Sequence, residues 1–507
     1  MLAHQSAHSD DTARPRDYGG WRRQRSIGLL GLSTATTFTL MAALAAAVLL
    51  AALNLALLAY ATLPAILAAG LSLARINGEP LATIAICRLR WHYASARGYT
   101  RYKTPVVTEH PAGFTLPGVL APTTLLSAED GYGSEYGIVR DRRTGLLTPT
   151  LRVLPASMWL AERTDTDTWV ASWGNWLASL GRVPMIRWIT VTVDTAPEPG
   201  SALADAVTAA LDSSAPAASR LILAQLISAA PIVAADVDTS VSISFHPKFS
   251  SEQPRNLTEA VAEVSRLLPG LESALAGCGV TVLGRLTAPQ IAGVVRCAFD
   301  PAARGEITRL TARPQAKAAS QQAQALDWQD AGPFGAEEFP DHYRHDSGVS
   351  ATWAWHEAPR QNVTADVLAR LIIPGPYPKR VTLQYRPFPA ADASRVLEAE
   401  VNAASFRAHY RHRTGRDETA RDAFDQARAR QAAAEEAAGA GVCLMSMYVT
   451  VTVSHPDDLP RAAAWTEAAA GASKIRLRRM TYSQAAGFAA TLPCGICPAE
   501  HARRLPR

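Results

Sequence analysis

The residues best suited to chemistry lie near the end of the chain, in the sequence Cys494-Gly-Ile-Cys497, with His501 shortly after it. Two sulfurs at this spacing can hold part of a zinc site or cycle between thiols and a disulfide. A structural zinc site needs four ligands, and no second Cys-x-x-Cys occurs in the sequence. We therefore treat Cys494, Cys497 and His501 as candidate metal ligands, keep thiol redox chemistry as an alternative, and favour reduced structural cysteines.

A second group of candidate ligands consists of His342 and His345, beside Asp341 and Asp346. The surroundings are polar, and no convincing third ligand accompanies the two imidazoles, so we expect an exposed loop here. Elsewhere, no spacing of Ser, His and Asp places a nucleophile beside a base. The sequence therefore predicts neither a catalytic site nor a resident cofactor.

Nucleotide chemistry is not expected either. A phosphate-binding P-loop requires Gly-x4-Gly-Lys-Ser/Thr, because its backbone N–H groups surround the phosphates and its hydroxyl holds magnesium, and the sequence has no such segment. Gly131-Tyr-Gly133 lacks the third glycine of a dinucleotide-binding turn. Any ATP hydrolysis that this protein depends on should be supplied by another polypeptide.

Two similar series of strands and helices would position these residues, which predicts an α+β fold with repeated split β-α-β units. Alternation of apolar and polar residues indicates strands, and amphipathic spacing indicates helices. The first series comprises strands at Trp188–Val193 and Val241–Phe245, a helix at Asn256–Gly277, a strand at Val280–Leu283 and a helix at Ala288–Phe299. The second comprises a strand at Met447–Ser454, a helix at Asp458–Ala470, a strand at Lys474–Met480 and a helix at Ser483–Leu492.

Other segments complete the predicted body. Tyr136–Arg140 and Leu146–Val153 should form a β-hairpin, with Gly145 in the turn. The helix Thr166–Leu180 carries Trp169, Trp173 and Trp176 on one face, which favours a packed core stripe over a membrane-interface belt. We expect a polar linker at 301–347 and a long helical insertion from about Ala391 to Ala438.

The strongest signal in the sequence is the stretch 26–74, which contains no Asp, Glu, Lys, Arg or His. A single helix of this length would be roughly 70 Å long, more than twice the ~30 Å hydrocarbon core of a bilayer. Two antiparallel spans fit better, near Gly28–Leu50 and Ala52–Ala74, with the reversal close to Asn54. A cleaved signal peptide would have a shorter apolar region, nearer the start of the chain.

Basic residues crowd both flanks of this stretch, which places both ends of the hairpin in the cytoplasm. They are Arg14, Arg16, Arg22, Arg23 and Arg25 before it, and Arg75, Arg88, Arg90, Arg97, Arg101 and Lys103 after it. We therefore expect a cell-membrane protein with two spans and with its N- and C-termini cytoplasmic. The expected order is a basic N-terminus (1–25), the hairpin (26–74), a juxtamembrane basic linker (75–105), a β-rich module with the first α/β unit (106–300), the polar linker (301–347) and the second α/β unit (348–507).

Composition limits the class of partner. The net charge is only +5, so a general nucleic-acid surface is not directly indicated, and the basic excess beside the hairpin suits an anionic lipid bilayer. Six cysteines, mostly isolated, form no disulfide framework and suit a reducing compartment.

Several motifs resemble an actinobacterial, Streptomyces-type family of integral membrane proteins linked to conjugation-like type IV secretion gene clusters. They include Tyr18-Gly-Gly-Trp21-Arg-Arg, Gly78-Glu-Pro80-Leu, Arg97-Gly-Tyr-Thr-Arg-Tyr102, Pro117-Gly-Val-Leu-Ala-Pro-Thr-Thr-Leu-Leu126, Tyr136-Gly-Ile-Val-Arg-Asp-Arg-Arg-Thr-Gly-Leu146, Trp353-Ala-Trp-His-Glu-Ala-Pro-Arg-Gln-Asn362 and Pro374-Gly-Pro-Tyr-Pro-Lys-Arg380. The resemblance covers nearly the whole chain and implies a role in macromolecular transfer.

The cytosolic part also resembles the N-terminal, non-hydrolytic half of the type IV secretion ATPase. Gln484-Ala-Ala-Gly-Phe488-Ala-Ala-Thr-Leu492-Pro493 is similar to the helix that precedes the motor in that ATPase. This resemblance implies a non-catalytic adaptor in a hetero-oligomer with other secretion membrane subunits and a separate cytosolic secretion ATPase. The alternatives are the E component of a type VII (ESX-type) secretion complex, and a membrane-bound thiol oxidoreductase or zinc-stabilised protein that uses Cys494 and Cys497.

Overall fold

The computed structural model covers the 507 residues of the chain. It describes residues 18–19, 41–42, 45, 70, 74–76, 79–104, 115–157, 161–197, 212, 214–229, 235–250, 252–307, 326–359, 361–389, 392–395, 397–398, 420–437, 439, 441–498 and 500. The predicted hairpin at 26–74 and the basic N-terminus at 1–25 lie almost wholly outside these residues, and so does His501. Within the described part, no helix combines the length and the apolar character that crossing a bilayer requires.

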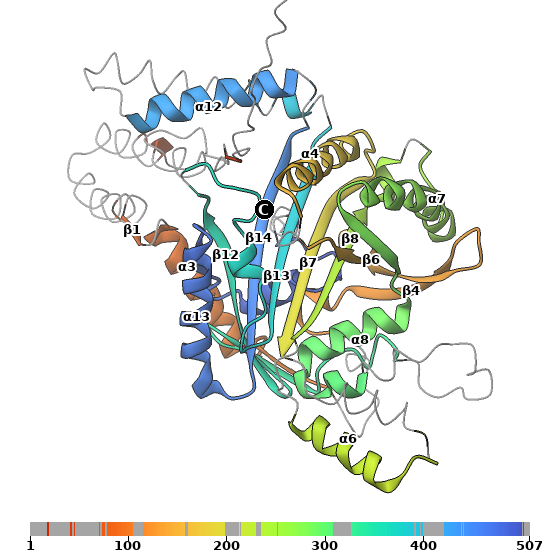
Figure 1. Ribbon diagram of the computed structural model, residues 1–507. Helices are drawn as coiled ribbons and strands as arrows, with labels where there is room; N and C mark the ends of the chain where they lie inside the picture. The colour runs from red at the N-terminus through yellow and green to blue at the C-terminus, as the bar shows by residue number, and fades with distance from the viewer. Residues whose placement is uncertain are drawn as a thin grey trace, which may run out of the picture.

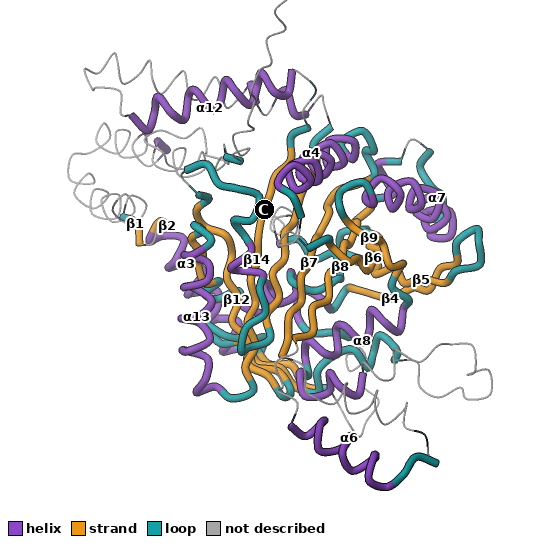
Figure 2. Tube along the Cα trace, viewed as in Figure 1, coloured by secondary structure: helices purple, strands orange, loops and turns teal. Residues whose placement is uncertain are grey.

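The described residues form a mixed helix-and-sheet fold, which confirms the predicted α+β class. A sheet of 13 described strands runs through the molecule, with helices on both of its faces (Figures 1 and 2). Its strands are β3 (Arg101–Lys103), β4 (Thr123–Glu129), β5 (Glu135–Asp141), β6 (Leu147–Pro155), β7 (Ile186–Pro197), β8 (Ala235–Phe245), β9 (Val280–Arg285), β10 (Gly335–Glu338), β11 (Tyr343–His345), β12 (Gly348–Glu357), β13 (Lys379–Pro387), β14 (Cys443–Val453) and β15 (Arg476–Arg479).

The helices lie around this sheet and beyond its ends. They are α3 (Leu81–Ala96), α4 (Arg163–Leu180), α6 (Ala217–Ala229), α7 (Leu257–Ala276), α8 (Ala288–Phe299), α10 (Ala369–Ile372), α12 (Ala420–Ala437), α13 (Leu459–Ala472) and α14 (Gln484–Ala490). Short 3-10 turns occur at Gly118–Leu120, Pro247–Phe249, Pro301–Ala303 and Pro456–Asp458. A separate pair of two-residue strands, β1 (Arg75–Ile76) and β2 (Glu79–Pro80), precedes α3.

The sheet has the same strand order on either side of its centre. Strands β7 and β13 are antiparallel neighbours in the middle, followed outward by β8, β6, β5 and β4 on one side and by β14, β12, β11 and β10 on the other. In each half the element order is strand, helix, strand, helix (β8-α7-β9-α8 and β14-α13-β15-α14), and β6 or β12 lies between the two strands. The repeat predicted from the sequence thus builds two related halves of one sheet.

The central strands have one apolar face and one polar face because apolar and polar residues alternate along them. In β7, for example, Ile189 faces one side while Thr190 and Thr192 face the other, and all three are buried. The apolar face packs against α4 and α7 in one half, and against α10 and α13 in the other. Of the predicted tryptophan stripe, Trp176 is buried in this core and Trp173 packs against it, as expected of a core helix.

The opposite side, which we call the hydroxyl face, is buried although it is polar. Its residues are Thr148, Thr150, Thr190, Thr192, Ser242, Ser244, Ser350, Thr352, Thr382, Thr450 and Thr452. Most of them form hydrogen-bonded pairs across neighbouring strands, which removes the cost of burying an unpaired hydroxyl. The pairs are Thr148–Ser244 (3.0 Å), Thr150–Ser242 (2.8 Å), Ser350–Thr452 (2.8 Å), Thr352–Thr450 (2.9 Å) and Thr192–Thr382 (3.0 Å). The last pair joins β7 to β13 and therefore links the two halves.

Two segments predicted as linkers contain helices or strands. The juxtamembrane stretch 75–105 contains helix α3 and strand β3, and the polar segment 301–347 contains β10 and β11. The two segments also meet, since β3 pairs with β10. The strands in these segments are only three or four residues long, so pairing with distant strands decides their structure more than local pattern does.

The Thr192–Thr382 hydrogen bond provides a test of the link between the halves. A single Thr382→Val substitution leaves the Thr192 hydroxyl buried and unpaired, so we expect a loss of about 1–3 kcal/mol in unfolding free energy. The double variant Thr192→Val/Thr382→Val removes both polar groups and should lose less than the two single variants summed. Chemical denaturation of the purified protein, followed by tryptophan fluorescence, measures this. Thr481→Val, at an exposed position, is the control. Strictly additive losses would contradict the pairing.

Candidate functional site

The segment that carries the cysteine pair lies against the hydroxyl face. Gly495 adopts a φ of 68°, in the left-handed region, and a Cβ at this position would lie only 2.2 Å from Thr148 Oγ1. The Gln384 side chain donates from Nε2 to the carbonyl oxygens of Ala490 (3.2 Å) and Ile496 (2.9 Å). Glycine is therefore required between the two cysteines because the backbone passes directly over the Thr148–Ser244 pair.

Both thiols of the pair are buried in this segment. Cys494 is 1% exposed and Cys497 is 0% exposed, and neither forms a disulfide. Burial raises the pKa of both thiols, since a thiolate would lose its hydration. Cys494 packs in an apolar cluster with Phe488, Leu492 and Ile496. These contacts fit the structural interpretation, because thiolate chemistry requires a lowered pKa and access to solvent.

The metal hypothesis gains no further ligand from the described residues. Among them, no group of three or more His, Cys, Asp or Glu side chains is placed to hold an ion. The third candidate, His501, lies outside the residues that the structure describes.

The two histidines have separate structural roles: His342 lies in the loop between β10 and β11, whereas His345 lies in a strand, where the expected loop is wrong. His345 lies in β11 and is 1% exposed, with Nδ1 2.6 Å from the Phe299 carbonyl oxygen and Nε2 2.8 Å from Ser350 Oγ. The carbonyl can only accept, so Nδ1 carries the proton and Nε2 accepts from the hydroxyl. Burial lowers the pKa of His345 to about 4. His342 instead stacks on Phe339 and lies 2.8 Å from Asp341 Oδ1.

The structure also assembles a charged network that sequence reasoning missed. The Arg304 guanidinium donates to Asp194 (2.7 Å) and to Asp236 (3.0 Å), which lie on β7 and β8. Arg380, on β13 opposite Asp194, is 6% exposed and has its guanidinium 4.8 Å above the Phe488 ring. Burial lowers the pKa of Arg380 to about 10. In the sequence, the only signal is that Asp194 and Arg380 are charged, whereas the residues two positions away on the same strands, Thr192 and Thr382, carry hydroxyls.

Two arginines and two aspartates in this network balance in charge, which indicates a structural rather than a catalytic role. Asp194, Arg304 and Arg380 border a small hollow at one end of β7 and β13, together with Cys297, Lys379 and Thr452. Burial raises the pKa of Cys297 to about 11, so its thiol is held in the neutral form. A neutral thiol beside charge-paired carboxylates offers neither a nucleophile nor a free base.

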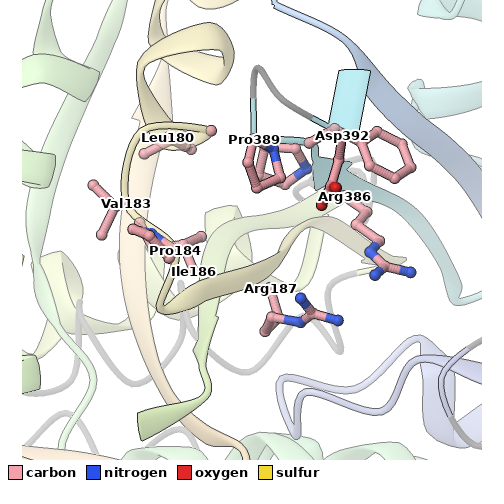
Figure 3. A pocket seen from close by; sticks show the side chains of 11 residues that line it. Leu180, Val183, Pro184, Ile186, Arg187, Arg386, Pro389 and Asp392 are labelled. Atoms are coloured by element: carbon pink, nitrogen blue, oxygen red, sulfur yellow. The ribbon is translucent and has the colours of Figure 1, made fainter. Parts of the chain in front are cut away.

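A second hollow lies at the opposite end of the same two strands (Figure 3). It is bordered by the turn that follows α4, by the start of β7 and by the end of β13. The Arg187 guanidinium lies 4.7 Å from the Phe249 ring, and that of Arg386 lies 5.9 Å from the Trp188 ring and 5.5 Å from the Phe388 ring. These arginines are thus engaged with aromatic rings, and the hollow presents no carboxylate–imidazole or thiol–imidazole pair among its lining residues.

The sheet edge at β9 has the properties of a docking surface. Among the described strands, β9 pairs only with β6, so one row of its backbone N–H and C=O groups has no strand beside it. Leu283 of β9 and Leu154 of β6 are each 57% exposed. We call Val280–Arg285 together with Leu154 the β9 edge.

The equivalent strand in the other half has charges where β9 has none. Strand β15 pairs only with β12 among the described strands and carries Arg476, Arg478 and Arg479. Positive charge on an edge strand discourages pairing with another chain. Arg285, the only charged residue of β9, is bound to Glu272 (2.5 Å) and Asp130 (2.9 Å). The β9 edge is therefore the unprotected one of the two.

Two motifs distant in the sequence meet on the body. Tyr18 and Val363 form a two-residue antiparallel bridge, with N–H to carbonyl distances of 2.7 and 2.8 Å. The Tyr18 hydroxyl also donates to Asp167 Oδ1 of α4 at 2.7 Å. A Cβ on Gly19 would lie 2.3 Å from the Asn362 side chain, so the glycine allows this close approach.

Comparison with known proteins adds no family or relative. No family model matches the chain, and no curated protein matches it.

The buried thiols should resist modification in the folded protein. We expect Cys494 and Cys497 to stay unmodified by iodoacetamide between pH 7 and 8, since their raised pKa values leave almost no thiolate. Both should react fully after denaturation. Mass spectrometry of proteolytic fragments measures this, with the half-buried Cys87 as a control for access. Rapid alkylation in the native state, or zinc in a one-to-one ratio with the protein, would contradict the structural interpretation.

Burial of His345 predicts a pH dependence of stability. Because its folded-state pKa of about 4 lies below the ordinary 6.5, the unfolded chain takes up the proton first as the pH falls. The stabilisation is complete above pH 6.5 and is lost as the pH falls through about 4, to a maximum of about 3 kcal/mol. Denaturation at a series of pH values should show a smaller slope in His345→Asn than in the wild type. His342→Asn is the control, and an equal slope in all three proteins would contradict the assignment.

Proposed function

We propose that this chain is a non-catalytic, membrane-anchored component of a conjugative or type IV-like secretion apparatus, and that it docks a separate ATPase. The anchor is the two-span hairpin at 26–74, with both chain termini in the cytoplasm. The described body is the cytosolic docking platform. Such tethering raises the local concentration of whatever the body binds.

The observation that carries the proposal is that both flanks of the apolar stretch contact the same body. Before the stretch, Tyr18 pairs with Val363. After it, α3 follows directly, and Trp91 of α3 packs against Tyr482 with ring centroids 5.9 Å apart. A segment that leaves a body and returns to it crosses a bilayer an even number of times, which supports two spans rather than one.

The nature of the buried polar groups supports an adaptor over the oxidoreductase alternative. The Cys494 and Cys497 thiols are buried with raised pKa values, and Arg304 forms ion pairs with Asp194 and Asp236. These groups stabilise the fold. Exposed features, by contrast, include the β9 edge and the apolar side chains of helix α6, both of which suit contact with other proteins.

We assign the docking of the ATPase to the β9 edge. An extended segment of the partner can add to an unpaired sheet edge through main-chain hydrogen bonds, while its side chains contact Leu154 and Leu283. The resemblance to the non-hydrolytic half of the type IV secretion ATPase supports this partner, because related α/β units can associate through their sheets.

Charge on the β9 edge should abolish docking. We expect Thr281→Lys/Leu283→Lys to lower the recovery of the secretion ATPase in a mild-detergent pull-down by at least about tenfold, since added lysines block strand addition. Both positions are exposed, so the fold should be retained. The matched control is Leu221→Lys/Leu226→Lys on α6, where both leucines are as exposed as Leu283.

The two parts of the proposal fail differently. If the wild-type protein recovers no ATPase under conditions that preserve the complex, the adaptor function is wrong. If the β9 variant recovers as much ATPase as the α6 control, docking occurs elsewhere on the body.

A further inference from the structure

Helix α3 (Leu81–Ala96) presents an apolar stripe to solvent. Ile86, Leu89 and Tyr93 are 51%, 71% and 59% exposed, and their spacing of three and four residues places them on one side of the helix. The opposite side holds Ile84, Cys87 and Trp91, which are half-buried, and Trp91 packs against Tyr482. Ile86, Leu89 and Tyr93 therefore pack against neither the sheet nor the helices that cover it.

The helix is also strongly basic. Arg88, Arg90 and Arg97 are exposed, and no Asp or Glu occurs between Leu81 and Thr104. The Arg97 guanidinium lies 5.4 Å from the Tyr93 ring, so a cation and an aromatic ring are held together beside the apolar stripe. Large apolar side chains flanked by arginine are typical of helices that lie in a membrane interface.

The position of α3 in the chain brings it to the end of the predicted hairpin. Strands β1 and β2 form a tight reversal, with Arg75 opposite Pro80, and the backbone N–H of Leu81 donates to the carbonyl of Ala74 at 2.9 Å. Ala74 is where the second predicted span ends. The first residue of α3 is thus hydrogen-bonded to the last residue of the span, and α3 runs along the margin of the body from there (Figure 1).

We propose that the outer face of α3 binds the cytosolic surface of a bilayer that contains anionic lipid. Ile86, Leu89 and Tyr93 enter the boundary between headgroups and acyl chains, while Arg88, Arg90 and Arg97 contact the lipid phosphates. This inference rests on the proposed membrane anchor. It goes further in naming the surface that fixes the orientation of the body, since a helix bound along its length prevents the body from rotating on the hairpin.

A lipid surface fits these residues better than nucleic acid does. Arginine and tyrosine would serve either ligand, because both are anionic. Burial of Ile86 and Leu89, however, stabilises only a complex with an apolar layer, and a nucleic-acid backbone offers none. The two ligands therefore make opposite predictions for a probe at position 89.

The test uses the full chain, reconstituted in nanodiscs that contain phosphatidylglycerol, with a nitroxide attached at Leu89→Cys in a Cys87→Ser/Cys443→Ser background. We expect the nitroxide at position 89 to be more accessible to oxygen, which concentrates in the bilayer, than to a water-soluble nickel chelate. A nitroxide at Leu221→Cys on α6, where the native leucine is 61% exposed, is the matched control and should show the reverse ratio. The reversal Arg88→Glu/Arg90→Glu/Arg97→Glu should abolish the oxygen preference at position 89.

The outcomes distinguish failure of the membrane anchor from failure of the α3 proposal. Failure of the chain to incorporate into nanodiscs would overturn the anchor itself. Incorporation with the same accessibility at positions 89 and 221 would overturn the α3 proposal and leave the anchor standing. An unchanged ratio in discs of phosphatidylcholine alone would overturn the role of anionic lipid, and protection of position 89 by double-stranded DNA instead of by lipid would assign the helix to nucleic acid.

Discussion

The structure depends on the burial of a polar sheet face. One side of the central strands carries buried threonine and serine residues, and burying a hydroxyl is costly unless it forms a hydrogen bond. Cross-strand pairs supply the partners within each half, and Thr192–Thr382 supplies one between the halves. Because a one-residue slip would turn the hydroxyls into the apolar core, the pairs also fix the register of the strands.

The last described elements of the chain cover the hydroxyl face. Helix α14 and the Cys494–Cys497 segment lie on it, held by the Gln384 amide and by the close approach at Gly495. The cysteines fill apolar space above a polar surface, where a larger or charged side chain would not fit. The Cys-x-x-Cys spacing, which by sequence alone suits metal or redox chemistry, therefore serves packing in the fold.

The proposed function uses surfaces of the described body rather than an enclosed site. The two halves are alike in strand order but differ at their edges: β15 is protected by arginines, and β9 is not. Because the two halves differ at these edge strands, the single sheet offers different contact surfaces on its two sides. Helix α3 adds a third surface, beside the predicted anchor, whose basic and apolar side chains match the chemistry of a membrane.

The sequence by itself determined the α+β class, the repeated order of strands and helices, and the positions of long elements such as α7, α8 and α13, because alternation and amphipathic spacing are local signals. The tertiary structure decided that the two units share one sheet, that residues in the expected linkers form α3, β3, β10 and β11, and that His345, Arg380, Cys494 and Cys497 are buried. Short strands and buried polar groups depend on partners distant in the chain: β3 requires β10, and Arg380 lies opposite Asp194. Local pattern contains no information about such partners, so only the folded arrangement could assign them.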